Sequence, residues 1–272
     1  MFSGVGRMGG EYHIELDDKV EPVIHPPRRV SYSLLEKLKL KLQELEEKDV
    51  IQKVDIPTPW VNSLVIVKKR DGSLRLCLDP RDLNKAIRHE HHSIPTAEDI
   101  ASHLSGKRVS SIVDEKDGFW QVPLDDESSY LCTSSTPYGR YRFKWMPFGM
   151  KSAPEVFQKK NESIFGDIDG VDVIFDDIIF AGAHEQEHDQ IMVKLLQRAR
   201  EANVKFNTAK LQYKVSEVKH MGNIVSESGL KLDGKKVRAI IQMPSPQSKE
   251  DVAEILRNGQ LLLPVYSQTV GN

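Results

Sequence analysis

The sequence predicts an α+β fold in which antiparallel β-hairpins are flanked by amphipathic helices. Two observations predict it. Short apolar runs rich in β-branched residues flank tight turns at several places, which is typical of hairpins. Between them, leucine and isoleucine recur at helical spacing. With 272 residues, the chain can bury a sizeable core as one large or two small domains.

Composition and charge are those of an ordinary globular protein. The net charge of −2 and the pI near 6.5 mean that any binding of nucleic acid must rest on local basic patches. Cys77 and Cys132 are too few for a disulfide framework and indicate a reducing compartment. There is no secretory signal and no membrane-spanning apolar run, so we expect an intracellular, cytoplasmic or nuclear location and no membrane partner.

The first 48 residues divide into an arm and a helix. Residues 1–27 hold three glycines in the first ten positions and Pro26-Pro27, which favours an extended or frayed arm. From Ser31 or Ser33 to Lys48 the pattern predicts a helix. Its apolar stripe consists of Leu34, Leu35, Leu38, Leu42 and Leu45.

A basic hairpin is predicted next. Alternating apolar strands at 63–67 and 74–78 flank Asp71-Gly72, a strong turn signal. The segment from Val67 to Arg88 carries a local net charge of +4 in an otherwise acidic chain. Such a hairpin is either a soluble edge strand or a grip for triphosphate or template backbone. Its charged residues are Lys68, Lys69, Arg70, Arg75, Arg81, Lys85 and Arg88, against Asp71, Asp79 and Asp82.

The second half of the chain continues the alternation of strands and helices. We expect a turn at 138–140, a strand at 141–145 and a break at 147–149, then a helix from Ala153-Pro154 to about Phe165. A further helix from about Glu185 to Ala202 would end at a left-handed Asn203. Its inward residues would be Ile191, Leu195, Ala199 and Ala202. Strands are expected at 205–225, and the tail from 261 shows no periodicity.

Three aspartates are the candidate metal ligands. Val171–Phe180 reads as two apolar runs joined by Asp176-Asp177, which predicts a buried hairpin with both carboxylates at its bend. An Asp pair alone would favour an exposed turn. However, a second apolar run, Val109–Asp114, also ends in aspartate. Carboxylates at adjoining strand ends suit two Mg²⁺ ions that clamp a phosphoryl transfer, and Asp114, Asp176 and Asp177 would hold them.

Four ordered blocks extend this argument: KKRDGSLRLCLDPRDLNKAI, DEKDGFWQVPLD, MPFGMKSAPEVFQ and IFDDIIFAG. With them, the chain from about Glu11 to Pro246 resembles the reverse transcriptase of gypsy-type LTR retrotransposons. The resemblance implies a right-hand polymerase fold, with an antiparallel palm sheet flanked by helices and a fingers subdomain. It divides the chain into an arm (1–27), fingers with the first palm elements (28–108), a palm with the catalytic aspartates (109–225) and a partial thumb with an atypical tail (226–272).

The resemblance implies an RNA-directed DNA polymerase, a nucleotidyltransferase that adds dNTPs to a primer on an RNA or DNA template. Two Mg²⁺ ions, with Mn²⁺ as a substitute, would sit on the three aspartates. Lys69 and Arg75 would hold the triphosphate, with Arg81 in the same block. The other implied roles are phosphate contacts from Asp117 and Gly118, exclusion of a 2′-hydroxyl by Phe119, a nucleotide-packing loop at Phe148 and Gly149, a proton donor at Lys210, and a primer-holding turn at 220–223.

Three positions depart from the family pattern. Ile174 replaces the usual Tyr two residues before the Asp pair. Glu115 replaces an apolar residue, and its side chain should point to the strand face opposite Asp114. Asn161 replaces the usual Met on an inward helix stripe, where an unsatisfied amide would cost about 1–3 kcal/mol.

Two other functions compete with an active polymerase. One is a catalytically impaired, nucleic-acid-binding remnant of a Pol polyprotein. RNase H and integrase regions are not recognised. A ribonuclease H label for this chain would be inherited from the parent polyprotein, because no set of carboxylates that could support that activity follows residue 250. The other, remote, is a zinc hydrolase, because His184-Glu185-Gln186-Glu187-His188 matches H-E-x-x-H. Its polar flanks predict a solvent-facing segment. The oligomeric state is not predicted.

Overall fold

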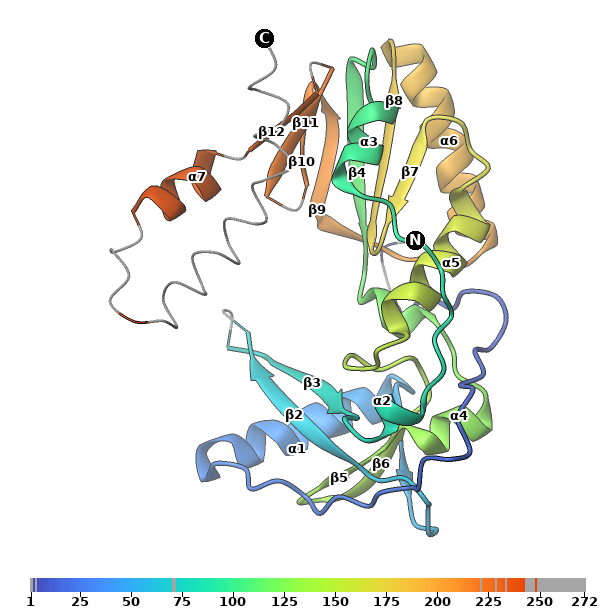
Figure 1. Cartoon of the computed structure of the whole chain (residues 1–272), viewed down its shortest axis with the longest axis vertical. Helices are drawn as coiled ribbons and strands as arrows, with labels where there is room; N and C mark the ends of the chain where they lie inside the picture. The colour runs from blue at the N-terminus through green and yellow to red at the C-terminus, as the bar shows by residue number, and fades with distance from the viewer. Residues whose placement is uncertain are drawn as a thin grey trace.

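Two β-sheets organise the chain in the computed structural model (Figure 1). It describes residue 2 and residues 4–69, 72–220, 222–227, 229–232, 234–242 and 248. One sheet has five strands in the order β1-β6-β5-β2-β3, and the other has four in the order β7-β8-β4-β9. The predicted α+β class is confirmed.

The five-stranded sheet contains the basic hairpin. Its strands are β1 (Ile51–Val54), β2 (Asn62–Lys68), β3 (Leu74–Asp79), β5 (Thr133–Thr136) and β6 (Gly139–Phe143). β2 and β3 pair antiparallel from Ser63↔Asp79 to Lys68↔Leu74, which confirms the predicted hairpin. Helix α1 (Tyr32–Glu47) lies beside this sheet and buries Leu38, Leu42 and Leu45. The short helices α2 (Leu83–Ala86) and α4 (Asp126–Leu131) complete this part.

The four-stranded sheet is covered on both faces. Its strands are β4 (Val109–Glu115), β7 (Val171–Ile174), β8 (Asp177–Gly182) and β9 (Phe206–Val215). Val113, Ile178 and Phe180 share one apolar cluster with residues of α5 (Ala153–Phe165) and α6 (Glu185–Glu201). The alternate residues Ile112 and Ile179 belong to a second cluster with α3 (Ala97–His103). Because both faces of β8 are buried, its sequence reads as an apolar run, whereas the edge strand β9 is largely exposed.

A small antiparallel sheet and a helix follow β9. Strands β10 (Glu217–His220), β11 (Asn223–Ser226) and β12 (Gly229–Leu232) pair in sequence order, and α7 (Gly234–Ile241) comes next (Figure 1). Val218 and Val225 pack into the second apolar cluster beside α3. Most of the atypical tail predicted for the thumb, including 249–272, lies outside the described residues.

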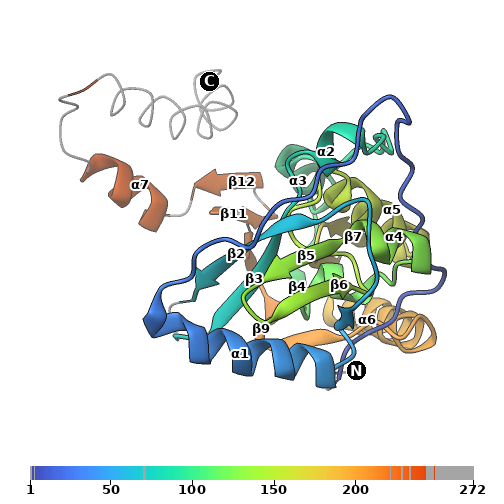
Figure 2. The same ribbon diagram turned by 90° about the horizontal axis from the view of Figure 1, so that it is seen from below.

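The N-terminal arm is extended but not frayed. Tyr12 forms an isolated bridge with Leu124, and Leu16 forms one with Ile87. Met8 and Ile14 are buried in the main core. The arm runs around the outside of the molecule to the start of α1 (Figure 2). Of the two predicted alternatives, the described residues of the arm show the extended one, because Met8 and Ile14 anchor it in the core.

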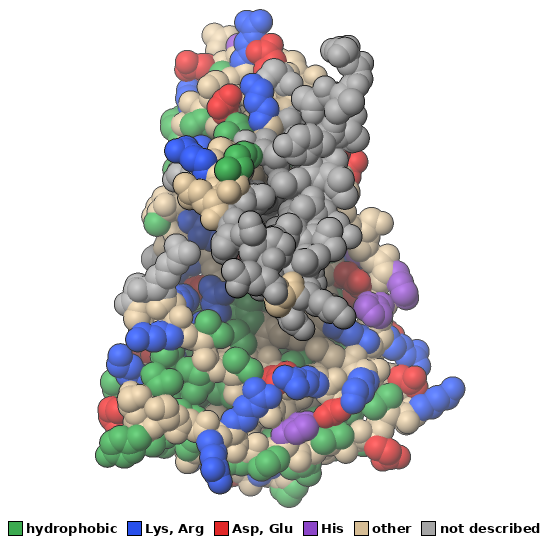
Figure 3. Space-filling model, turned by 60° about the vertical axis from the view of Figure 1, so that its left-hand side comes forward, with side chains coloured by type: hydrophobic (Ala, Val, Ile, Leu, Met, Phe, Trp, Pro, Cys, Tyr) green, Lys and Arg blue, Asp and Glu red, His purple; other side chains and the backbone are tan. Residues whose placement is uncertain are grey.

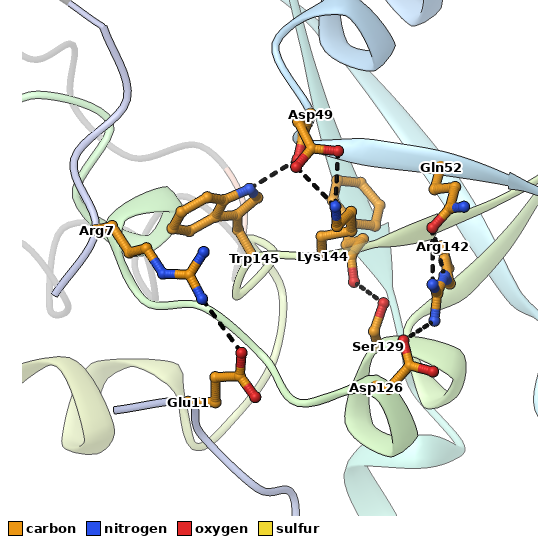
Figure 4. A network of polar contacts seen from close by, with 10 residues as sticks. Arg7, Glu11, Asp49, Gln52, Asp126, Ser129, Arg142, Lys144 and Trp145 are labelled. Carbon is orange, nitrogen blue, oxygen red and sulfur yellow. Dashed lines mark hydrogen bonds and ion pairs between the residues drawn. The ribbon is translucent and has the colours of Figure 1, made fainter. Parts of the chain in front are cut away.

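A polar network ties the arm to the end of β6 (Figure 4). Asp49, in left-handed conformation with φ of 56°, accepts from Lys144 Nζ at 2.6 Å, and its carbonyl accepts from Trp145 Nε1 at 2.8 Å. Arg7 of the arm lies over the Trp145 ring, 5.9 Å from its centroid. These contacts end the strand at Phe143, two residues earlier than predicted.

The same network buries the guanidinium of Arg142. Its nitrogens donate to Gln52 Oε1 of β1 and to Asp126 of α4, while Ser129 of α4 donates to the Phe143 carbonyl at 2.7 Å (Figure 4). As a result β5 and β6, which fall inside the predicted palm range, belong to the five-stranded sheet together with β1 and β2. The five-stranded sheet therefore includes strands from both sides of residue 108, the end of the predicted fingers range.

Candidate active site

The ends of β4 and β8 bring the predicted carboxylates together. Asp114 pairs in register with Asp177, and β7 and β8 form the predicted hairpin with Ile174 opposite Asp177. The bend is Phe175-Asp176, and Phe175 has a left-handed φ of 52°. The backbone N–H of Glu115 donates to the Asp176 carbonyl at 2.7 Å. The hairpin bend is thus attached directly to the end of β4.

Asp114 and Lys210 form an ion pair at this edge. Lys210 Nζ lies 2.5 Å from Asp114 Oδ2. Burial raises the pKa of Asp114. The hydrogen bond and positive charge of Lys210 oppose this rise, and the negative charges of Asp176 and Asp177 add to it. Burial lowers the pKa of Lys210, but the hydrogen bond to Asp114 and the three negative charges raise it overall. Lys210 therefore stays a cation next to the carboxylates.

The donor set has the chemistry that a hard divalent cation requires, since three carboxylates converge on one sheet end. Two of the three carboxylates face basic side chains of the chain itself. Asp177 Oδ2 lies 3.2 Å from Nε2 of the buried His220, and Asp114 faces Lys210. Within the described ranges, no three acidic, His or Cys side chains are gathered closely enough to hold an ion. Metal binding would require these side chains to exchange partners.

Glu115 is a buried carboxyl directly behind the site. Its exposed fraction is 1%, and neither carboxyl oxygen has a hydrogen-bond partner among the described residues. It follows Asp114 in β4, so it points to the opposite face, as predicted, toward the Asn161 amide of α5. Burial raises the pKa of Glu115 well above its ordinary value. The neighbouring Asn161 amide opposes this rise, and the Asp176 and Asp114 charges add to it.

The basic hairpin supplies the opposite wall. Lys69 closes the turn, with its N–H donating to the Ser73 carbonyl at 2.8 Å. The Arg75 guanidinium lies over the Phe148 ring, 5.1 Å from its centroid. The loop that carries Phe148 is pinned to β3, because Leu78 N–H donates to the Phe148 carbonyl at 2.9 Å. Gly149 has φ of 111°, and a Cβ there would lie 2.0 Å from the Leu78 carbonyl oxygen, so only glycine fits.

The floor between the walls is aromatic and tightly packed. After β4, Asp117 adopts a left-handed φ of 52° and begins a 3₁₀ turn, Gly118–Gln121. A Cβ on Gly118 would lie 2.8 Å from the Phe157 ring and 3.3 Å from Asp176 Cβ. Phe119 is half-buried, and its ring centroid lies 5.2 Å from that of Phe148. Glycine here lets the aromatic floor approach the acidic turn.

One cavity of about 340 Å³ collects most of the predicted site residues. Arg81, Gly149 and Asp177 do not line it. The Arg81 side chain is 78% exposed and donates to Asp79, so the structure does not bring it to the site. Figure 3 shows Lys and Arg side chains over the part of the molecule below a central hollow. The lining residues are Lys69, Arg75, Asp114, Asp117, Gly118, Phe119, Phe148, Asp176 and Lys210, together with Glu115, Lys116, Phe157 and Asn207.

Four of these lining residues were not predicted as site residues. Asn207 pairs in register with Asp114 across β4 and β9, which sequence spacing does not reveal. Lys116 follows the acidic strand end and also lines a larger adjoining cavity of about 620 Å³ beside α1. Both cavities share Lys69 and Arg75. The run Asp114–Asp117 places the single base Lys116 among three acidic residues, and this is the signal that could have pointed to Lys116.

The H-E-x-x-H segment does not form a metal site. His184 is the N-cap of α6, where its Nδ1 accepts from Glu187 N–H at 3.2 Å. His188 is fully buried, not solvent-facing as predicted, and hydrogen-bonds Ser111 Oγ at 2.8 Å while stacking on Phe180. His184 thus caps the start of α6, and His188 packs in the core. The zinc hydrolase hypothesis is not supported.

Asn161 is better satisfied than predicted. Its side chain is fully buried, but Nδ2 donates to the Phe175 carbonyl at 3.0 Å. Only Oδ1 lacks a partner among the described residues. The prediction of an unpaired amide is therefore wrong for the NH₂ group of Asn161, because the Phe175 carbonyl accepts its hydrogen bond.

A carboxylate-bearing antiparallel sheet that faces a basic hairpin across an aromatic-floored cavity is the arrangement of the right-hand polymerase fold. The model of the reverse transcriptase (RNA-dependent DNA polymerase) family matches residues 67–243, and the chain belongs to this family. The predicted family is confirmed. In the described part of the chain, no helix is long and apolar enough to cross a membrane.

Curated relatives include retrotransposon polyproteins. The chain is 34% identical over 243 residues to an uncharacterized Caenorhabditis elegans protein, covering 88% of this chain and 19% of that protein. It is 29% identical to the retrovirus-related Pol polyprotein from transposon 412 of Drosophila melanogaster, covering 85% of this chain and 19% of the relative. The chain thus spans about a fifth of the length of these relatives.

Solved structures confirm the predicted fold. The foamy viral protease-reverse transcriptase in complex with dsDNA superposes with a TM-score of 0.86 at 21% identity, covering 99% of this chain and 59% of that one. The same viral enzyme in complex with an RNA/DNA hybrid gives a TM-score of 0.82 at 20% identity, covering 97% and 37%. At these identities, the likeness concerns the fold.

Proposed function

We propose that this chain is the polymerase portion of a retrotransposon Pol polyprotein and adds dNTPs to a primer on an RNA or DNA template. The observation that carries the proposal is the 340 Å³ cavity, in which Asp114 and Asp176 face Lys69 and Arg75. A triphosphate placed there would meet cations on the fingers side and metal-binding carboxylates on the palm side. Phosphoryl transfer needs little beyond such positioning and charge.

Each side chain then has a role that follows from its place. Asp114, Asp176 and Asp177 would hold two Mg²⁺, or Mn²⁺ in substitution. When bound, the ions would lower the pKa of the attacking 3′-hydroxyl and offset charge on the leaving oxygens. Lys69 and Arg75 would neutralise the triphosphate, and Phe148 orients the Arg75 guanidinium by stacking.

The remaining roles concern shape and protons. Phe119 forms the floor on which a sugar would rest, so a 2′-hydroxyl would collide with its ring. Backbone groups at Asp117 and Gly118 would contact phosphates, since Gly118 leaves room beside Asp176. Lys210 keeps its proton near Asp114 and would donate it to pyrophosphate. Arg81 would act only at the outer rim, and Gly149 through backbone packing.

The proposed domain layout keeps the arm at 1–27, fingers at 28–108, palm at 109–225 and partial thumb from 226, with β5 and β6 joining the fingers sheet. The partners would be a template with primer and dNTPs. The segment 220–223, where β10 ends and β11 begins, would hold the primer; residue 221 of this segment lies outside the described residues. The location would be cytoplasmic or nuclear.

Primer extension on a poly(rA)/oligo(dT) template tests the proposal. We expect extension that requires Mg²⁺, stops on chelation and is abolished by Asp176→Asn. Asp169→Asn removes an exposed carboxylate from the loop before β7 and should leave extension unchanged. Equal activity of the two variants would refute the site assignment.

A catalytically impaired remnant that binds nucleic acid is the second candidate. The ion pairs of two carboxylates favour this candidate. Asp114 pairs with Lys210 and Asp177 pairs with His220, and both pairs would have to break before a metal could bind. Ile174, where related chains usually carry Tyr, adds to this. Binding of template–primer without Mg²⁺-dependent extension would select this candidate over the polymerase.

A further inference from the structure

The bend that carries Asp176 is a strained piece of backbone. Phe175 holds a left-handed φ of 52°, a conformation that bulky residues rarely adopt. Such conformations persist only where the surrounding structure fixes them. Phe175 is followed directly by Asp176, so whatever fixes Phe175 also sets where the Asp176 carboxylate points.

Two buried amides of α5 hold this residue. Gln158 Oε1 accepts from Phe175 N–H at 2.8 Å, and Gln158 Nε2 donates to the Val173 carbonyl at 2.7 Å. One helical turn further, Asn161 Nδ2 donates to the Phe175 carbonyl at 3.0 Å. Both side chains are fully buried. Both backbone polar groups of Phe175 are therefore bound by side chains of one helix.

Asn161 cannot be exchanged for a residue of similar size without loss. The Phe175 carbonyl only accepts hydrogen bonds, so the amide must present its N–H₂ to the bend and its Oδ1 elsewhere. The Glu115 side chain lies beside this amide, on the strand face opposite Asp114. Meanwhile the Glu115 backbone N–H holds the Asp176 carbonyl. Strand β4 and helix α5 thus grip successive carbonyls of the same bend.

We propose that Asn161 is a positioning residue that orients the Asp176 carboxylate through its hydrogen bond to the Phe175 carbonyl. Asn161 does not line the 340 Å³ cavity, so it would act through Asp176. A methionine here would fill the space but donate no hydrogen bond, so the amide supplies a polar contact that fixes the acidic bend. The effect on catalysis, although not the grip itself, rests on the proposed polymerase function.

Hydrogen exchange measured by mass spectrometry tests the grip directly on the full chain. In Asn161→Leu, segment 171–180 should exchange about five- to tenfold faster, the factor expected for losing one buried hydrogen bond. Asn62→Leu is the matched control, because Asn62 is equally buried and donates to the Leu131 and Thr133 carbonyls, away from the bend. It should destabilise the chain and leave segment 171–180 unchanged.

Equal acceleration in both variants, or none in Asn161→Leu, overturns the proposal. If Asn161→Leu does not fold, the double variant Glu115→Val/Asn161→Met removes the amide and its acidic neighbour together and should show the same acceleration. Glu115→Val alone keeps the hydrogen bond and should show none.

Primer extension supplies a second readout. At equal folded fractions, Asn161→Leu should raise the Mg²⁺ concentration for half-maximal extension several-fold, and Asn62→Leu should not. An unchanged Mg²⁺ requirement in Asn161→Leu overturns the positioning role. If the unmodified chain extends no primer, the proposed function fails instead, and the exchange experiment still decides whether Asn161 holds the bend.

Discussion

Replacing Glu115 by glutamine should stabilise this protein, and the gain should grow as pH rises. Glutamine keeps the shape of the side chain and removes its ability to ionise. In addition, its N–H₂ could donate to Asn161 Oδ1, which lacks a partner among the described residues. The substitution therefore relieves a buried carboxyl without opening a cavity.

The sign follows from proton binding. Burial raises the pKa of Glu115 well above its ordinary value, so the folded chain holds this proton more tightly than the unfolded chain does. The free energy of unfolding then falls as pH rises from the ordinary value toward the folded-state pKa. The slope in that window is at most about 1.4 kcal/mol per pH unit for one proton. Against a total of about 5–15 kcal/mol, such a loss is readily measured.

Urea unfolding of the full chain between pH 5 and 8 provides the assay. The difference in unfolding free energy between Glu115→Gln and the unmodified chain should widen with pH. Glu36→Gln, on the exposed side of α1, should follow the unmodified chain throughout. Parallel curves for Glu115→Gln and the unmodified chain would show that this carboxyl does not retain its proton through burial.

Four further predictions concern nucleotide addition. Asp114→Asn should abolish extension without lowering the melting temperature, since it removes a buried charge from the site; extension near the unmodified rate would contradict the assignment. Phe119→Ala should lower the measured discrimination between dNTPs and rNTPs, and unchanged discrimination would make Phe119 only a core aromatic. Gly118→Ala should raise the KM for dNTP, because its Cβ would meet the Phe157 ring at 2.8 Å; an unaltered KM would mean that the floor yields. The unmodified chain should bind template–primer but make short products at physiological salt, because phosphate contacts largely hold a polymerase on its template; long products would refute this.

Local pattern was sufficient for most elements of the fold. The α5 helix begins at Ala153 and ends at Phe165 as predicted, and Asn203 adopts the expected left-handed φ of 54°. The hairpin that carries the aspartate pair also follows from sequence, although its bend is Phe175-Asp176, one residue earlier than predicted, and Asp177 begins β8. These features depend on periodicity and turn chemistry within a few residues, which the order of side chains alone sets.

The sequence by itself also identified the family and the two walls of the site, because the motifs and their order are properties of the chain. Only the tertiary structure decided which distant residues meet. Lys210 reaches Asp114, and the buried Glu115 lies beside Asn161, because pairing of β4 with β9 and packing against α5 place them there. The physical reason is that local order sets backbone conformation, whereas contacts between remote segments depend on how whole faces bury their apolar surface. A departure that looked costly in isolation, an amide in an apolar stripe, is thereby accommodated by a backbone carbonyl from another element.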